Sequence, residues 1–297
     1  MKNTADILCI GSVLWDVIGR SPTQMRVGSD VPGRITRLPG GVALNIAMTV
    51  RRFDMVPALL SAIGQDSEGR ELIAACQQMG MITDHLHLSE NWPTDRYMAV
   101  EGAGGLIAAI ADAHTLEAAG DKILAPLEDG TLGSAHQPFA GLVALDGNLT
   151  VDLLKEISAR PSFGAADLRV APASPGKAKR LLPLMAHPGT TLYVNLEEAG
   201  LICGRAFTTA TDGAKGLLDQ GATRVLVTNG AQGAADGSAD HMLTAIPPRV
   251  APRRITGAGD TFMAAHIAAE LKGALPQDAL NGALNAAATY VSGEDPA

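Results

Sequence analysis

Cysteine is scarce in this sequence. The 297 residues contain three cysteines, Cys9, Cys76 and Cys203, and no two of them are close together in the chain. A disulfide framework needs pairs of cysteines and a cysteine-rich zinc site needs clustered ones, so both are excluded. The scarcity is typical of a reducing compartment, and we expect a cytoplasmic protein. Cys9 itself is expected to be a small buried hydrophobe.

Long apolar runs are missing as well. No stretch reaches the ~20 consecutive apolar residues that a membrane-spanning helix needs. The first apolar run, 7–14, is flanked by Asp6 and Asp16, whereas a secretion signal has a basic start and a cleavage site of small residues. We therefore expect no export and no contact with a membrane.

The chain also lacks a surplus of positive charge. Lys and Arg number 23 against 31 Asp and Glu, the net charge is −8, and both signs are dispersed along the sequence. This balance disfavours a nucleic-acid partner, and an anionic substrate would need local cationic help. Hydrophobic residues make up 46% of the chain, which is enough for the substantial core of a globular protein.

Short apolar segments alternate with segments of helical periodicity. The expected strands are 7–13, 58–63, 142–145, 168–171, 192–194 and 225–228, followed by a β-meander over 233–236 and 241–246. The expected helices are 42–53, 68–79, 151–159, 176–185, 258–272 and 276–291. Such alternation predicts an α/β fold with a doubly wound, mainly parallel sheet covered by helices on both faces. We expect a single domain over 1–297.

Two segments, about 12–39 and 92–114, depart from this alternation. Within the second, 97–100 and 106–110 flank 101–105 like a hairpin. We expect both segments to build one small β-sheet beside the carboxyl ends of the parallel strands, where open α/β sheets bind ligands, and to act as a lid. The alternative is an edge sheet for dimer contacts, and the two roles are compatible.

The most informative segment is 255–262, ITGAGDTF, which leads directly into a helical stretch. A loop with Gly257 and Gly259 that opens a helix points several backbone N–H groups at one anion, and the helix dipole adds to their positive end. Asp260, in the first turn, can accept a proton from a hydroxyl held beside that anion. The pattern indicates phosphoryl transfer to an alcohol. In the simpler alternative the glycines only turn the chain and Asp260 only caps the helix.

A second pair of glycines, Gly40 and Gly41, also opens a helix. It places Asn45 about one turn into that helix, where its amide can bond a sugar hydroxyl, and Asp16 can accept hydrogen bonds from a vicinal diol. Two other nucleotide-binding motifs are missing. The chain has no Walker loop, and 11–16 reads GSVLWD rather than the dinucleotide fingerprint Gly-x-Gly-x-x-Gly.

In this order the motifs resemble the ribokinase (PfkB-type) family of sugar and nucleoside kinases over nearly the whole chain. The matching elements are Gly-Gly…Asn at 40–45, Gly-x-Asp-x-x-Gly at 64–69, Asn-x-x-Glu at 195–198, Thr-x-Gly…Gly at 228–233 and Gly-Ala-Gly-Asp at 257–260. The last is the most specific signature. The resemblance implies a ribokinase-like fold and ATP-dependent phosphorylation of a sugar or nucleoside hydroxyl.

The resemblance also implies roles for individual residues. It makes Asp260 the catalytic base, and it makes Gly257, Ala258 and Gly259 the amides that hold the phosphoryl oxygens. Glu198 would organise Mg²⁺ through water. The implied substrate-binding residues are Asp16, Gly40, Gly41 and Asn45. The implied ATP-binding residues are Asn195, Thr228, Gly230, Gly233, Thr256 and Asn285. The expected cofactors are therefore ATP and Mg²⁺, which neutralises part of the phosphate charge.

One position departs from the family pattern. Cation-activated relatives carry Asp two residues before the Thr of Thr-Gly-Ala-Gly-Asp, where it helps to hold K⁺, and this chain has Arg254 there. A guanidinium cannot ligate K⁺, so we expect K⁺ not to be required. Arg254 could instead supply positive charge near the loop, or it could form a solvated basic pair with Arg253.

Family membership leaves the acceptor open. Three segments, 106–112, 144–149 and 171–180, are most similar to pseudouridine kinases and favour pseudouridine as the acceptor. The alternatives are a kinase for another nucleoside or sugar, such as ribose, fructose, adenosine or inosine, and a catalytically silent sugar-binding relative. The intact Asp260 weighs against silence. Besides ATP and this small molecule, the expected partner is a second copy of the chain, bound through the lid.

Overall fold

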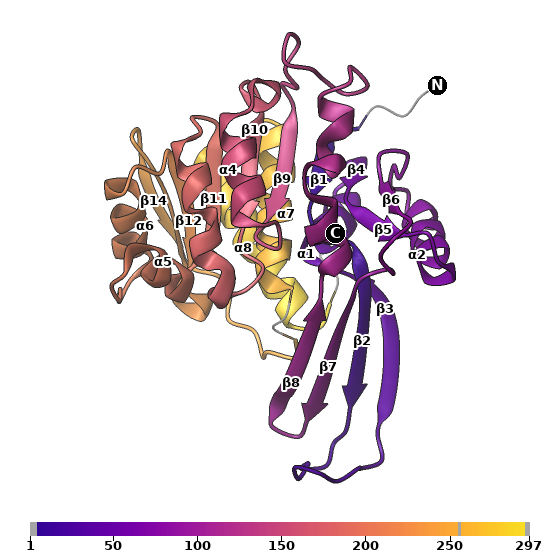
Figure 1. Cartoon of the computed structure of the whole chain (residues 1–297). Helices are drawn as coiled ribbons and strands as arrows, with labels where there is room; N and C mark the ends of the chain where they lie inside the picture. The colour runs from indigo at the N-terminus through magenta and orange to yellow at the C-terminus, as the bar shows by residue number, and fades with distance from the viewer. Residues whose placement is uncertain (1–4, 255–256, 295–297) are drawn as a thin grey trace.

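An eight-stranded sheet forms the centre of the computed structural model, which describes residues 5–254 and 257–294. Its strands, in spatial order, are β14 (Met242–Ala245), β13 (Ala234–Ser238), β12 (Arg224–Thr228), β11 (Thr190–Asn195), β10 (Asp167–Ala171), β9 (Leu142–Asp146), β1 (Ile7–Ile10) and β4 (Pro57–Leu60). The six from β12 to β4 are parallel, and β13 and β14 form the antiparallel meander (Figure 1).

Helices cover both faces of this sheet because successive strand residues point to opposite sides. Leu8 and Ile10 join one core with α4 (Val151–Ala159), α5 (Leu196–Cys203), α6 (Ala210–Asp219) and the 3₁₀ segments η1 (Gly120–Leu127) and η3 (Pro175–Ala186). Ile7 and Cys9 join the other core with α1 (Val42–Arg51), α2 (Ser67–Gln78), α7 (Ala258–Leu271) and α8 (Pro276–Val291). Strands such as β1 and β4 are apolar along their whole length because both of their faces are buried.

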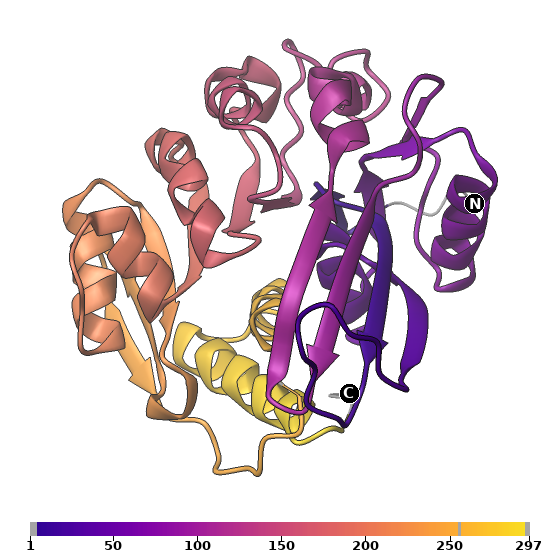
Figure 2. The ribbon, with the colours of Figure 1, turned by 60° about the horizontal axis from the view of Figure 1, so that its bottom comes forward.

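A second sheet of four strands has the order β3 (Arg34–Gly40), β2 (Leu14–Arg20), β7 (Arg96–Gly102) and β8 (Gly105–Asp112). Only β2 and β7 pair in parallel. The four strands come from the two predicted insertions, and they project from the large sheet where β2 follows β1 (Figures 1 and 2).

The α/β architecture with a small second sheet confirms the fold prediction, and three details differ from it. The expected strand 58–63 is two strands, because β5 (Ala62–Gly64) leaves the large sheet and pairs with β6 (His87–Ser89). Gly11, at φ +146, turns the chain and ends β1 three residues earlier than expected. The helix expected over 176–185 is the 3₁₀ segment η3, which contains Pro183, a residue without a backbone N–H.

Two further expectations concern burial and membranes. Cys9 is fully buried in the second core, as expected of a small hydrophobe. Over residues 5–254 and 257–294, no helix is both long and apolar enough to cross a membrane.

Candidate active site

The carboxyl ends of the parallel strands bring the predicted residues together. Asp146 ends β9, Asn195 ends β11 and Thr228 ends β12, while Ser12 follows β1. The helix α1 begins at this edge, where Val42 N donates to Ser12 Oγ and Ala43 N to Asp146 Oδ2, and the Asn45 side chain of α1 acts on the Asp260 carboxylate in the first turn of α7. This edge is where open α/β sheets bind their ligands.

The loop before α7 has the shape of an anion site. Gly257 caps the helix at φ +89, and a side chain there would collide with the Tyr290 hydroxyl. A Cβ on Gly259 would meet nothing within 4 Å, so this turn faces open space. The first N–H groups of a helix have no partner inside it. Those of Ala258, Gly259 and Asp260 are therefore available to phosphoryl oxygens.

The carboxylate of Asp260 is poised to exchange a proton near neutral pH. Burial raises its pKa to about 7, and the negative charges of Asp146 and Glu198 act in the same direction. The hydrogen bond from Asn45 lowers the pKa and keeps part of the anionic character. A general base is most efficient when its pKa lies near the working pH. Asp260 thus has the protonation chemistry that the sequence predicts for a base.

Asp16 lies on β2 and faces the same side of the small sheet as its β7 partner Tyr97. Burial raises the pKa of Asp16 to about 6. A side chain on Gly40 would collide with the Asp16 carboxylate, and one on Gly41 would collide with the Ser12 carbonyl. The two glycines therefore let the carboxylate of the small sheet approach the start of α1. Within the described chain no protein hydrogen bond occupies the Asp16 carboxylate, which leaves it for a ligand.

Asp146 joins the elements of the site, and its role was missed in the sequence. It is fully buried, and its Oδ2 accepts hydrogen bonds from Ser12 N at 2.7 Å, Ser12 Oγ at 2.8 Å and Ala43 N at 3.1 Å. Its Oδ1 accepts from Asn148 N at 2.7 Å. One carboxylate thereby holds β1, β9 and the start of α1. The available signal was an acidic residue at the end of an apolar strand.

Asn195 and Glu198 cap α5 reciprocally. The Glu198 N–H donates to Asn195 Oδ1 at 2.9 Å, and the Asn195 N–H donates to Glu198 Oε2 at 2.8 Å. Burial, together with the charge of Glu197, raises the pKa of Glu198. Among the described residues no group of three or more His, Cys, Asp or Glu could hold a metal ion. Mg²⁺ commonly keeps several waters and uses one carboxylate plus phosphates, and Glu198 Oε1 suits that role.

The remaining predicted ATP residues fall into two places. Thr228 leads into the 3₁₀ turn η4 (Gly230–Gln232), which Gly233 closes at φ +107. Glycine is required at this position because a side chain would also collide with the Ala245 carbonyl. Asn285 lies apart from this turn. It lines a cavity of about 390 Å³ with Phe53, just after the end of α1, and Lys272, which caps the end of α7; both lie at the opposite helix ends from Gly41 and Gly257. Thr256 lies outside the described residues.

Arg254 is bound to the end of α8. Its Nε donates to the Tyr290 carbonyl and its Nη2 to the Glu294 carbonyl, both at 2.7 Å. Its guanidinium carbon stands 3.8 Å from the centroid of the Tyr290 ring, whose hydroxyl lies against Gly257. Arg254 thus connects the carboxyl end of α8 with the glycine that opens the anion site.

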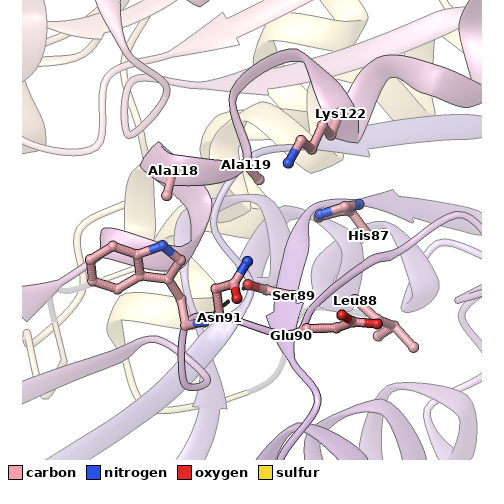
Figure 3. A pocket seen from close by; sticks show the side chains of 9 residues that line it. His87, Leu88, Ser89, Glu90, Asn91, Ala118, Ala119 and Lys122 are labelled. Carbon is pink, nitrogen blue, oxygen red and sulfur yellow. Dashed lines mark hydrogen bonds between the residues drawn. The ribbon is translucent and has the colours of Figure 1, made fainter.

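The Gly-x-Asp-x-x-Gly motif links α2 to the small sheet. Asp66 caps α2 by accepting from Gly69 N, and it also accepts from the N–H and hydroxyl of Thr94, just before β7. Beside this link lies a cavity of about 300 Å³ (Figure 3) lined by Trp92, His87 and Lys122. Burial and the Lys122 charge lower the pKa of His87. The lining residues come from β6, the segment after it, α3 (His114–Ala119) and η1, and they do not include Asp260.

The fold and the site define a class of enzyme, a kinase that passes a phosphoryl group from a nucleotide to an alcohol. A family model described as pfkB family carbohydrate kinase matches residues 4–296. The chain therefore belongs to the pfkB family of carbohydrate kinases, and it is an ATP-dependent sugar or nucleoside kinase.

Individual relatives agree with this assignment. The chain is 27% identical to the pseudouridine kinase of Escherichia coli (strain K12) over 273 residues, which cover 89% of this chain and 83% of the relative. It is 28% identical to the uncharacterized sugar kinase YeiI of the same organism over 207 residues, 68% of this chain and 54% of the relative.

Solved structures share the fold. A carbohydrate kinase from Agrobacterium tumefaciens superposes with a TM-score of 0.78 at 24% identity, over 96% of this chain and 90% of the other. The Arabidopsis thaliana ribokinase complexed with ribose and ATP does so with a TM-score of 0.78 at 19% identity, over 97% and 93%.

Proposed function

We propose that this kinase phosphorylates the 5′-hydroxyl of a ribosyl group, and that its acceptor is pseudouridine. The hydrogen-bonded pair of Asn45 and Asp260 beside the open turn at Gly259 is the observation that carries the proposal. The likeness to a pseudouridine kinase along 89% of the chain supports the choice of acceptor. The three segments that resemble pseudouridine kinases support it as well.

The proposed mechanism assigns one task to each group. Asp16 accepts hydrogen bonds from the 2′- and 3′-hydroxyls of the ribosyl ring. Asp260 takes the proton of the 5′-hydroxyl while the bond from this oxygen to the γ-phosphorus forms and the bond to ADP breaks. The N–H groups at the start of α7 stabilise the charge on the equatorial oxygens. Mg²⁺, when bound through the phosphates and water beside Asn195 and Glu198, supplies further positive charge.

We also propose that the small sheet closes over the acceptor as a lid and pairs with a second copy of the chain. Asp16 lies on one face of this sheet. Strand alternation places Ile35, Met98 and Ile110 on the opposite face, where all three are exposed. Light scattering is expected to give a dimer mass, and Ile110→Glu is expected to shift it to the monomer. A wild-type monomer at micromolar concentration would contradict the pairing.

The cysteines and the net charge bear on where the enzyme works and on which partners it has. We propose that it works in the cytoplasm and without a nucleic-acid partner. The three free cysteines and the dispersed net charge of −8 support both statements.

The acceptor is tested by ADP release over a panel of pseudouridine, uridine, adenosine, inosine, ribose and fructose. The proposal expects the highest kcat/KM with pseudouridine, by at least about tenfold over uridine. A preference for ribose or fructose would replace it with a simple sugar kinase. ADP release that no acceptor stimulates would indicate a silent relative.

A further inference from the structure

Lys177 stands between the acceptor side and the nucleotide side of the site. It belongs to η3, directly after β10, and β10 lies between β9 and β11 in the sheet. The carboxyl end of β9 carries Asp146, next to the acceptor residues. The carboxyl end of β11 carries Asn195, on the side of the nucleotide. A group that passes from the nucleotide to the acceptor therefore crosses the carboxyl end of β10, and Lys177 lies in the segment that follows this strand.

A chain of hydrogen bonds fixes the position of Lys177. Its Nζ donates to Asn148 Oδ1 at 2.5 Å, and Asn148 Nδ2 donates to Ser12 Oγ at 2.8 Å. Ser12 Oγ in turn accepts from Val42 N at 2.9 Å, at the start of α1. Both polar atoms of the Asn148 side chain are occupied, so its orientation is determined. The ammonium group is thereby attached to the same framework that supports Asn45 and Asp260.

The charge of Asp146 reaches both Lys177 and Asp260. It favours the charged form of Lys177 and disfavours that of Asp260, so both groups lie within electrostatic reach of this carboxylate. In the described chain Asp146 accepts four hydrogen bonds from other groups, and Lys177 donates to Asn148 rather than to Asp146. Lys177 is thus joined through Asn148 and Ser12 to the carboxylate that acts on Asp260, and within the described chain it forms no ion pair with that carboxylate.

Lys177 has donors to spare. An ammonium group has three, and within the described chain only Asn148 accepts one of them. Burial, with the charge of Arg180, lowers the pKa of Lys177, so the protein groups around it disfavour its charged form. Arg180 itself is engaged with the carbonyls of Asn148 and Leu149 and with the carboxylate of Glu117. A half-buried cation with free donors suits an anionic ligand.

We propose that Lys177 binds the phosphoryl group during its transfer and is a catalytic residue of this kinase. The bond from the γ-phosphorus to ADP breaks, the bond to the acceptor oxygen forms, and the hydroxyl proton goes to Asp260. Lys177 stays protonated and donates to an equatorial oxygen. The carboxylates of Asp16, Asp260 and Glu198 repel the incoming phosphates, so a fixed cation at this point lowers the barrier.

The test compares two nucleotides that differ in the γ-phosphoryl group. Calorimetry with Mg²⁺ measures the affinities of ADP and of β,γ-imido-ATP for the wild type, Lys177→Met, and the control Lys179→Met at an exposed lysine two residues on. In Lys177→Met we expect about tenfold weaker binding of the imido nucleotide, an ADP affinity within about twofold of wild type, and a fall of kcat by 10²-fold or more. Lys177→Arg should recover part of the loss.

Several results would overturn the proposal. Equal weakening of both nucleotides would make Lys177 a support of the fold, as would a Lys177→Met protein that fails to melt cooperatively while Lys177→Arg has no catalytic defect. An effect confined to the KM of the acceptor would make it an acceptor-binding residue. The inference rests on the kinase activity, not on pseudouridine. The nucleotide comparison needs no acceptor, so it stands even if the acceptor panel rejects pseudouridine.

Discussion

The substitution Asp260→Asn distinguishes the contribution of this residue to turnover from its contribution to the stability of the fold. The amide has nearly the shape of the carboxylate and can still accept the hydrogen bond from Asn45, but it cannot take a proton. General-base catalysis contributes roughly 10²–10⁴-fold, so turnover should fall by this factor while ATP binding stays nearly intact. In free energy the loss is about 3–5 kcal/mol of activation barrier.

The same substitution should stabilise the fold at alkaline pH. The pKa of Asp260 is raised from 3.8 to about 7 by burial, so the folded chain binds this proton more tightly than the unfolded chain. Stability from this group is therefore complete below pH 4 and is lost as the pH rises through about 7. Asn carries no charge, so Asp260→Asn should exceed wild type in stability at pH 8 by about 1–3 kcal/mol, after a discount for relaxation.

Two measurements test the expected loss of turnover and the expected gain of stability. ADP release is followed at pH 8 under conditions in which chemistry is shown to be rate-limiting, and urea unfolding is measured at pH 5 and pH 8. Turnover above about a tenth of wild type would refute the role of Asp260 as base. Stability that is lower than wild type at pH 8 would refute the electrostatic argument. In the wild type, kcat should rise with pH through about 7 and then level off.

Four further changes probe other parts of the molecule. Asp16→Ala should weaken recognition of the acceptor, measured through kcat/KM, by about 1–3 kcal/mol and leave ATP affinity unchanged. An equal loss of acceptor recognition and of ATP affinity would instead indicate a role in folding. Hydrogen exchange over 97–110 should slow when acceptor and an ATP analogue bind, and unchanged exchange with both ligands bound would argue against a moving lid. Turnover should need Mg²⁺ and change little between K⁺ and a large inert cation, and a several-fold stimulation by K⁺ would contradict the expectation that K⁺ is not required. Arg254→Ala should lower kcat about tenfold, and a kcat within about twofold of wild type would make this arginine a bystander. Burial lowers the pKa of His266 to about 4, so the fold should lose stability as the pH falls from 6.5 to 4, and His266→Gln but not the exposed His136→Gln should weaken that dependence in urea titrations.

The arrangement of the large sheet could be predicted from the sequence because its strands are buried on both faces. A run such as ILCI at 7–10 has no polar side, which is typical of a parallel sheet between two helical layers. The small sheet was predictable for the opposite reason, since β8 is exposed along most of its length and interrupts the helical alternation. Local propensity failed at η3, where Pro183 prevents regular α-helical hydrogen bonding.

The residues of the site were predictable where a motif is local and were missed where partners are distant. Gly257 to Asp260 are consecutive, and Asn195 and Glu198 are one helical turn apart, so spacing alone relates them. Asp146 accepts from Ser12, 134 residues away, and from Ala43, 103 residues away. Such bonds depend on β9 lying beside β1, an adjacency that no local pattern contains.

The same reasoning explains a buried ionic cluster that the sequence presents as scattered charges. Arg224 binds Asp236 at 2.6 Å and Glu270 at 2.7 Å, and Arg169 also binds Glu270. These side chains come from β12, β13, α7 and β10, and each ion would be costly alone in the interior. The charges of Arg169 and Arg224 lower the pKa of Glu270, so it stays ionised despite its burial.

The charge of Asp146 disfavours ionisation of the Asp260 carboxylate, and this effect follows from the way the site is assembled. Asp146 accepts four hydrogen bonds and holds the start of α1 against β1 and β9. Its charge then disfavours ionisation of Asp260, which Asn45 of α1 partly offsets. The group that fixes the geometry of the helix thus also helps to raise the pKa of the base that this helix contacts. A base with an unperturbed pKa near 4 would be a poor proton acceptor at neutral pH, so the structural role of Asp146 and the proposed catalytic role of Asp260 are physically coupled.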